Sequence, residues 1–192
     1  MASFDDIYKQ TITLFNRAKI PDSDDSMWIP TVIEGVHLVT TNSSAWNTRG
    51  ERETDDVRLH IRYSPSGKDI LIPCKGSDGG IVQKKWYEPK AWRKLAELID
   101  STAISGDAEA GEAVAGETDV IHGNLITFAF GDTEAFDFFM EGVYEDVSEP
   151  ILDSDYERRG FYNYMNANYD NVFAITSVAK YNLIPHFEIM AR

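Results

Sequence analysis

Few side chains in this 192-residue sequence are spaced as a known catalytic or metal-binding motif requires. Zinc sites commonly take their ligands from close pairs such as C-x-x-C or H-E-x-x-H. The four histidines, His37, His60, His122 and His186, lie far apart and have no such partner. Cys74 is the only cysteine, and no residue beside it marks a base that would activate a thiol nucleophile. We therefore predict no metal site, no cofactor and no enzymatic activity.

Two further segments contain residue types that bind ions or phosphates. Residues 21–26 include three aspartates, but they lack the glycine and the distant glutamate of an EF-hand calcium loop. Residues 74–80 contain three glycines, but they lack the G-x-x-x-x-G-K-[ST] spacing of a phosphate-binding loop. We interpret the first segment as a turn and the second as a flexible loop.

Large aromatic and arginine side chains in polar surroundings indicate contact with a partner, because Trp, Tyr and Arg are enriched at interface hot spots. The candidate partner-interface residues are Trp46, Arg49, Arg52, Trp86 and Tyr87. The first three lie in a polar segment, 41–55, that we predict to be a loop. Trp46 has an alternative role, which is to cover one end of the core.

The elements that would position these residues are mostly strands. Residues 56–64 alternate strictly between apolar and polar, as a strand with one buried face does. A longer strand is predicted over 27–41, with a bulge or barrel corner at Gly35. Residues 172–178 and 187–191 predict a closing hairpin in the centre of the sheet, with the strand at 10–17 as its neighbour. Further strands are predicted at 70–73, 125–130 and 135–142, and helices at 88–96 and from 153 or 154 to 168.

These elements predict a mainly β fold: a small barrel or sandwich of about seven to nine mostly antiparallel strands, with two short helices and long loops. Residues 1–192 are expected to form one domain. Residues 101–119 are rich in Ser, Ala, Gly and acidic residues, which predicts a flexible insertion. We expect this insertion to be a loop that becomes ordered on assembly, with the acidic candidate residues Asp107, Glu109, Glu112 and Glu117.

The formal net charge of −14 argues against a surface that grips nucleic acid by neutralising its phosphates. The first residues show neither the basic nor the apolar part of a leader peptide. No apolar run approaches the roughly 18 residues of a membrane helix. We expect a chain that folds in a cytoplasm and does not enter a membrane.

Four segments carry a resemblance to a known family. They are 11–17 (TITLFNR), 28–36 (WIPTVIEGV), 169–178 (YDNVFAITSV) and 185–189 (PHFEI). In these segments the chain resembles an uncharacterised-domain family of small structural proteins from tailed phages and prophages. The pattern is similar to that of head–tail connector proteins, which include head-completion (stopper) proteins. The resemblance covers both ends of the chain and thins out between about residues 75 and 120.

The resemblance implies a virion protein of the phage neck, made in the bacterial host cytoplasm. It implies a homo-oligomeric ring, with a portal or adaptor protein on the head side and a tail terminator or tail tube on the other. Genomic DNA would pass through the lumen without sequence-specific binding. A tail terminator or adaptor of the same neck is an alternative. A more distant alternative is a carbohydrate- or ligand-binding β module that uses Trp46, Trp86 and Tyr87 as stacking platforms.

Overall fold

Residues 7–20, 23–47, 50–76, 78–103, 125–130, 136–145, 150–156 and 160–192 are described by the computed structural model of this chain. The strands are β1 (Gln10–Lys19), β2 (Ser26–Asn47), β3 (Gly50–Arg62), β4 (Ser64–Ser66), β5 (Asp69–Lys75), β6 (Ile81–Trp86), β7 (Leu125–Ile126), β8 (Phe138–Glu141), β9 (Ile151–Leu152), β10 (Val172–Tyr181) and β11 (His186–Ala191). The helices are α1 (Pro89–Ala103) and α3 (Gly160–Asn168), and a short 3₁₀ turn, η2 (Asp153–Asp155), precedes α3. No helix within these ranges is both long and apolar enough to cross a membrane.

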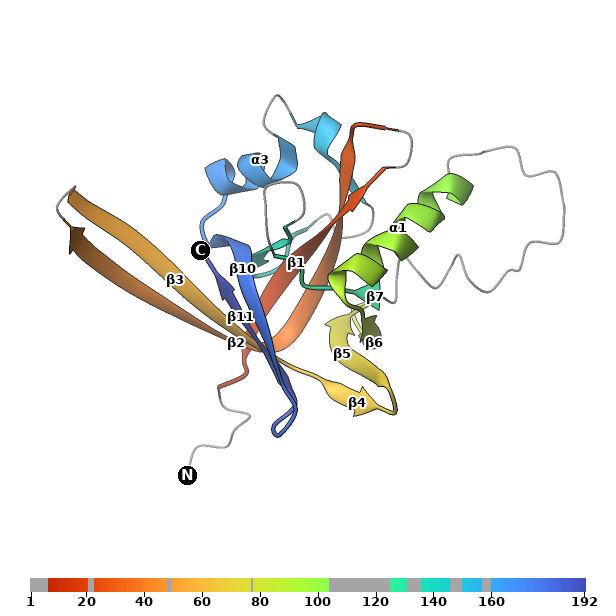
Figure 1. The fold of residues 1–192 in the computed structure, drawn as a ribbon, viewed down its shortest axis with the longest axis horizontal. Coiled ribbons are helices and arrows are strands. Elements are labelled where there is room, and N and C mark those ends of the chain that lie inside the picture. Colours follow the sequence, from red (N-terminus) through yellow and green to blue (C-terminus); the bar gives the residue numbers. More distant parts are fainter. Residues whose placement is uncertain are drawn as a thin grey trace, which may run out of the picture.

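Six strands close into an antiparallel barrel in the order β1, β8, β10, β11, β3, β2 and back to β1 (Figure 1). Strand β2 makes the closure possible, because its residues 26–36 pair with β1 and its residues 37–47 pair with β3. Strand β9 adds to β2, and a second sheet has the order β4, β5, β6, β7. The predicted mainly β fold is confirmed, in its barrel form.

Gly35 is the point at which β2 changes its neighbour. Gln10 pairs with Val36 and Thr11 pairs with Glu34, so Gly35 is left as the extra residue of a bulge. Its φ of 69° lies in the left-handed region, which glycine enters without the steric cost of a Cβ atom. The predicted bulge or barrel corner at Gly35 is therefore confirmed.

Replacing Gly35 by valine is expected to lower the free energy of unfolding by about 1–3 kcal/mol, because a β-branched residue is strained at positive φ. Space is not the problem, since the nearest atom to an added Cβ is the Tyr8 carbonyl oxygen at 3.9 Å. Urea unfolding of both proteins would measure the loss. Gly35→Asn is the control, because asparagine tolerates this conformation better. Equal stability of Gly35→Val and the parent chain would contradict the strain argument.

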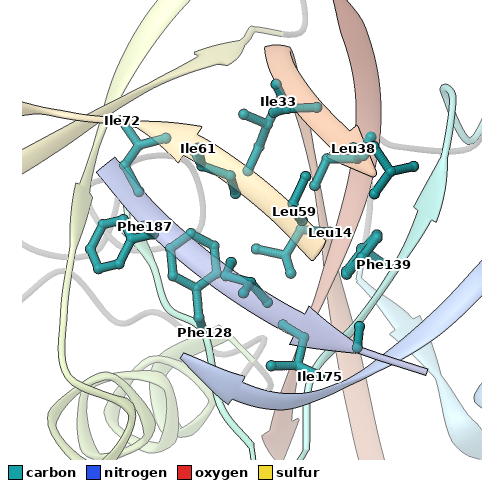
Figure 2. Packing of buried hydrophobic residues seen from close by; sticks show 14 of the residues in the cluster. Leu14, Ile33, Leu38, Leu59, Ile61, Ile72, Phe128, Phe139, Ile175 and Phe187 are labelled. Carbon is teal, nitrogen blue, oxygen red and sulfur yellow. The ribbon is translucent and has the colours of Figure 1, made fainter. Parts of the chain in front are cut away.

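The barrel interior is filled by side chains that alternate along each strand with outward-facing ones. Leu59 and Ile61 of β3 and Phe187 of β11 are fully or almost fully buried there. Ile72 of β5 and Phe128, which follows β7, belong to the same cluster (Figure 2). The second sheet and the segment after it therefore cover part of the barrel core.

Two smaller apolar clusters attach the helices to the outside of the barrel. Phe15 of β1 stacks on Phe138 of β8 with 4.6 Å between ring centroids, and Phe161 of α3 lies against both. On α1, Trp92 and Ala96 are buried in a separate cluster with residues of β1 and β2. The helix predicted at 88–96 is confirmed as part of α1.

Asp153 connects β1, β2 and α3. Its Oδ1 accepts hydrogen bonds from the Trp28 indole Nε1 at 2.7 Å and from the backbone N–H of Phe161 at 2.9 Å. Its Oδ2 lies 3.2 Å from the Arg17 guanidinium. The prediction that the helix begins at residue 153 or 154 is wrong, because 153–155 form the 3₁₀ turn and α3 begins at Gly160, which has a φ of 72°. The Asp153 carboxylate nevertheless caps α3, because it accepts a hydrogen bond from the backbone N–H of Phe161, which is eight residues further along the chain.

The prediction of a loop over 41–55 is wrong, because the backbone of 41–47 belongs to β2 and that of 50–55 belongs to β3. Strands β2 and β3 stay paired from His37↔His60 to Asn47↔Gly50, and this hairpin extends well away from the barrel (Figure 1). Backbone hydrogen bonds between strands do not require apolar side chains, so a polar composition did not prevent pairing. We call the part formed by residues 41–47 and 50–55 the hairpin arm.

Three other predictions need correction. The strand at 10–17 is not a direct neighbour of the closing hairpin, because β8 pairs with both β1 and β10 and lies between them. The flexible loop predicted over 74–80 is shorter, because β5 runs to Lys75 and pairs with β6, a strand that was not predicted. Helix α1 continues to Ala103 and so includes the start of the predicted insertion. Residues 104–119 of that insertion lie outside the described residues.

Candidate functional site

Three of the four histidines come together on the outer face of the barrel. Their neighbours along β2, β3 and β11 point into the core, so strand alternation turns His37, His60 and His186 outward. His37 is the cross-strand partner of His60, and His60 is also the partner of Glu188. We call His37, His60, His186 and Glu188 the histidine face.

The rings of the histidine face form a continuous row across the sheet. The His60 ring centroid lies 5.6 Å from that of His37 and 5.6 Å from that of His186. Aromatic rings extend the row at both ends. Tyr181 stacks on His186 at 4.9 Å with 9° between planes, and Tyr8 lies 5.9 Å from His37. These contacts restrict the orientation of the imidazoles.

Within this row, one group has the donors that coordinate a metal ion. His60, His186 and Glu188 are all half-buried, and their candidate ligand atoms lie within 4.8 Å of one another. Nδ1 of His186 is 2.7 Å from the carbonyl oxygen of Ile184. Because a carbonyl oxygen can only accept, Nδ1 carries the proton in this contact, and in the neutral form of the ring the lone pair is on Nε2.

Burial lowers the pKa of His60 from its ordinary value. The Glu188 carboxylate opposes this shift, whereas His37, His186 and Arg58 add to it. The neutral imidazole is therefore favoured at neutral pH. A neutral imidazole has one lone pair with which it can accept a hydrogen bond or coordinate a metal.

These three histidines lie far apart in the sequence but close together in the fold. Each occupies an outward position of its strand, but their proximity depends on the pairing of β2 with β3 and of β3 with β11. Alternation alone predicts which face of the sheet a residue occupies, and it does not predict which strands are neighbours. His122 lies outside the described residues.

A second titratable group, Asp137, lies inside the protein and is fully buried. Its carboxylate accepts hydrogen bonds from the backbone N–H of Arg17 and Ala129, at 2.9 and 2.7 Å, and from the Asn16 amide at 2.9 Å. Burial, opposed by these hydrogen bonds, raises its pKa to about 7. The Asn16 amide also donates to the carbonyl oxygen of Thr127 at 2.8 Å. Because a substrate cannot reach Asp137, we assign this network to the structure of the barrel wall.

Cys74 is buried beside Lys84 on the second sheet. Burial raises the pKa of its thiol to about 12, so almost none of it is the reactive thiolate at neutral pH. Lys84 is itself buried and donates to the Thr31 hydroxyl at 3.0 Å. This environment is typical of a structural cysteine.

The turn between β10 and β11 is an exposed apolar surface that was not predicted. Leu183 is 98% exposed and Ile184 is 56% exposed. Tyr181, at the end of β10, is 46% exposed. We call residues 181–184 the hairpin tip. It lies directly beside His186 of the histidine face.

The predicted partner-interface residues fall into two groups. Trp86 and Tyr87 are half-buried and pack against separate apolar clusters, so they are not the exposed platforms that were expected. The side chains of the other predicted residues lie outside the described part of the chain: Trp46, Arg49, Arg52, Asp107, Glu109, Glu112 and Glu117.

Comparison with known proteins identifies one group of distant relatives. The chain is similar to "Coenzyme A disulfide reductase" of Staphylococcus aureus strains JH9 and MSSA476, at 23% identity over 193 residues in each case. The match covers 89% of this chain but 44% of each reductase, so the chain spans less than half the length of these relatives. No protein-family model matches, and no solved structure matches.

Proposed function

We propose that this chain is a structural subunit of the neck of a tailed-phage or prophage particle. Its role would be that of a head–tail connector, in the head-completion (stopper) position, where a ring joins the portal side to the tail and retains packaged DNA. The sequence resemblance supplies the class of protein. A rigid barrel with long projections is the form that a ring subunit needs, because rings are built from repeated contacts between neighbouring copies.

The hairpin arm is the observation that carries this proposal. Apart from Thr41, which pairs with Asp56, its residues pair only with each other among the described strands, and they extend beyond the barrel (Figure 1). A two-stranded hairpin alone is only marginally stable in water, and an open strand edge can pair with another chain. We infer that the arm reaches a neighbouring subunit or the next ring of the neck.

The charge of the chain is compatible with a DNA passage. A formal net charge of −14 favours repulsion of phosphate over binding. A lumen lined by such subunits would let the genome slide through during packaging and ejection.

Deletion of the reading frame from an inducible prophage, followed by electron microscopy of the particles, tests the proposal. Heads that leak DNA beside free tails of normal length are the expected result. Tails of uncontrolled length would indicate the alternative role of tail terminator. Infectious particles of normal form would contradict a role in the neck.

The hairpin tip is expected to be a docking point in this assembly. Burying one leucine side chain contributes about 1.5–3 kcal/mol, so Leu183→Asp should weaken assembly roughly 10- to 100-fold. Folding of the monomer should be unchanged, because Leu183 is 98% exposed. Sedimentation of purified protein with its neck partners would measure the loss.

Ile81→Asp provides a matched control, since Ile81 is 73% exposed at the start of β6. Only the Leu183 variant should fail to assemble. Assembly of Leu183→Asp at parental strength would exclude the hairpin tip as a contact.

Two other functions are less well supported. The first is disulfide reduction, the activity in the name of the distant relatives. It would need a reactive thiolate, but the only cysteine is buried with a pKa of about 12. The glycines also lack the G-x-G-x-x-G spacing of flavin and nicotinamide binding folds. A carbohydrate-binding module would need exposed aromatic platforms, and Trp86 and Tyr87 are half-buried.

A further inference from the structure

We propose that His60, His186 and Glu188 bind a divalent transition-metal ion, for which Zn²⁺ is the best match, on the outer face of the barrel. Two imidazoles and one carboxylate are a donor set that zinc accepts, with a fourth position left open for water or another ligand. Imidazole donors select zinc and its neighbours over Mg²⁺ and Ca²⁺, which prefer oxygen ligands alone. This inference concerns a property separate from the proposed neck function.

The backbone brings the three donors close to one another. Pairing of β3 with β11 sets His60 opposite Glu188 and Arg62 opposite His186, so the donors occupy adjoining positions of one sheet surface. Their ligand atoms lie within 4.8 Å of one another. Tetrahedral zinc with bonds of about 2.0–2.1 Å places its ligand atoms roughly 3.4 Å apart. Small rotations of half-buried side chains would therefore bring the donors to bonding distance.

A second set of contacts prepares His186 to act as a ligand. Metal-bound histidines generally donate their other ring N–H to a carbonyl or carboxylate, which fixes the tautomer and the ring orientation. The Ile184 carbonyl oxygen, 2.7 Å from Nδ1, provides this contact and leaves Nε2 available for the metal. Tyr181 stacks on the same ring, almost parallel to it, with 4.9 Å between the ring centroids.

Metal binding would join β3 to β11 immediately beside the hairpin tip.

Binding of the metal is measured directly by calorimetric titration of untagged protein with Zn²⁺, in a buffer that does not chelate metals. We expect one ion per chain. The double variant His60→Gln/His186→Gln should bind at least ~100-fold more weakly, and Glu188→Gln should bind at least ~10-fold more weakly.

Glu34→Gln is the charge-matched control, because Glu34 lies on β2 and pairs with Lys75, outside this group. It should bind Zn²⁺ as the parent chain does. Absence of saturable binding to the parent chain would overturn the proposal. Undiminished binding by the folded double variant would overturn it as well.

A measurement on the unmodified chain covers the case in which the double variant fails to fold. Zn²⁺ titration followed by NMR of the imidazole carbon-bound protons should shift the signals of His60 and His186 at one equivalent. Shifts confined to other histidines would assign the ion elsewhere and exclude this site. The result does not depend on particle assembly, so it stands or falls separately from the neck function.

Discussion

Replacing Asp137 by alanine is expected to lower the free energy of unfolding by roughly 3–5 kcal/mol. The fully buried carboxylate accepts from three donors, the backbone N–H groups of Arg17 and Ala129 and the side-chain amide of Asn16. Alanine would leave these donors without an acceptor in a site that water does not reach. An unsatisfied buried donor costs about 1–3 kcal/mol, and the costs of neighbouring donors are not fully additive.

Urea unfolding at pH 7, followed by tryptophan fluorescence and circular dichroism, would measure this effect. Asp137→Asn should lie between alanine and the parent chain, because its amide keeps one acceptor oxygen and directs N–H groups at the remaining donors. Asp69→Ala is the control: this half-exposed aspartate pairs with Lys85, and such surface pairs contribute about 0–1 kcal/mol. A loss at Asp137 no larger than that at Asp69 would refute the role given to the buried network.

The second large effect expected of Asp137 is an unusual dependence of stability on pH. Burial raises its pKa to about 7 in the folded chain, from an ordinary value of 3.8. Between these values the folded state holds a proton that the unfolded state has released. The stabilisation is therefore complete below the unfolded pKa and is lost as pH rises through the folded pKa.

The measurement is the free energy of unfolding of the parent chain minus that of Asp137→Asn, at several values between pH 5 and pH 8. Each pH unit corresponds to about 1.4 kcal/mol, so this difference should fall by a few kcal/mol and then level off above about pH 7. Subtraction removes the contribution of the other carboxylates, which titrate in both proteins. A difference that stays constant or rises with pH would show that Asp137 is already ionised in the fold.

Local sequence patterns predicted those parts of the fold that depend on neighbouring residues. Alternation over 56–64 placed Leu59 and Ile61 in the core and His60 on the outer face, as observed. Gly35 within an apolar strand indicated the bulge, since few other residues accept its φ of 69°. The closing hairpin was predicted from the same kind of evidence.

Local sequence patterns could not predict which distant strands pair with one another. Strand β8 has four residues, yet it separates β1 from β10, and no local pattern encodes that position. The histidine face and the Asp137 network could not be predicted for the same reason, because each brings together residues that are far apart in the sequence. His60 meets Glu188 across strands more than 100 residues apart, and Asp137 meets Asn16 121 residues away. The hairpin arm was missed because its pairing uses backbone groups, which every residue type provides.

The closure of the barrel also determines when this chain can fold. Strand β11 (His186–Ala191) inserts between β3 and β10, and β8 joins β1 to β10, so the final ring of pairings spans most of the chain. Such a high contact order predicts folding in milliseconds to seconds, because long loops must close before their contacts form. A chain still on the ribosome, with residues 186–191 inside the exit tunnel, would expose the edge of β3. Closure of the barrel therefore waits until residues 186–191 have left the exit tunnel. Until then the nascent chain has an open sheet, and it is most prone to aggregate at this stage.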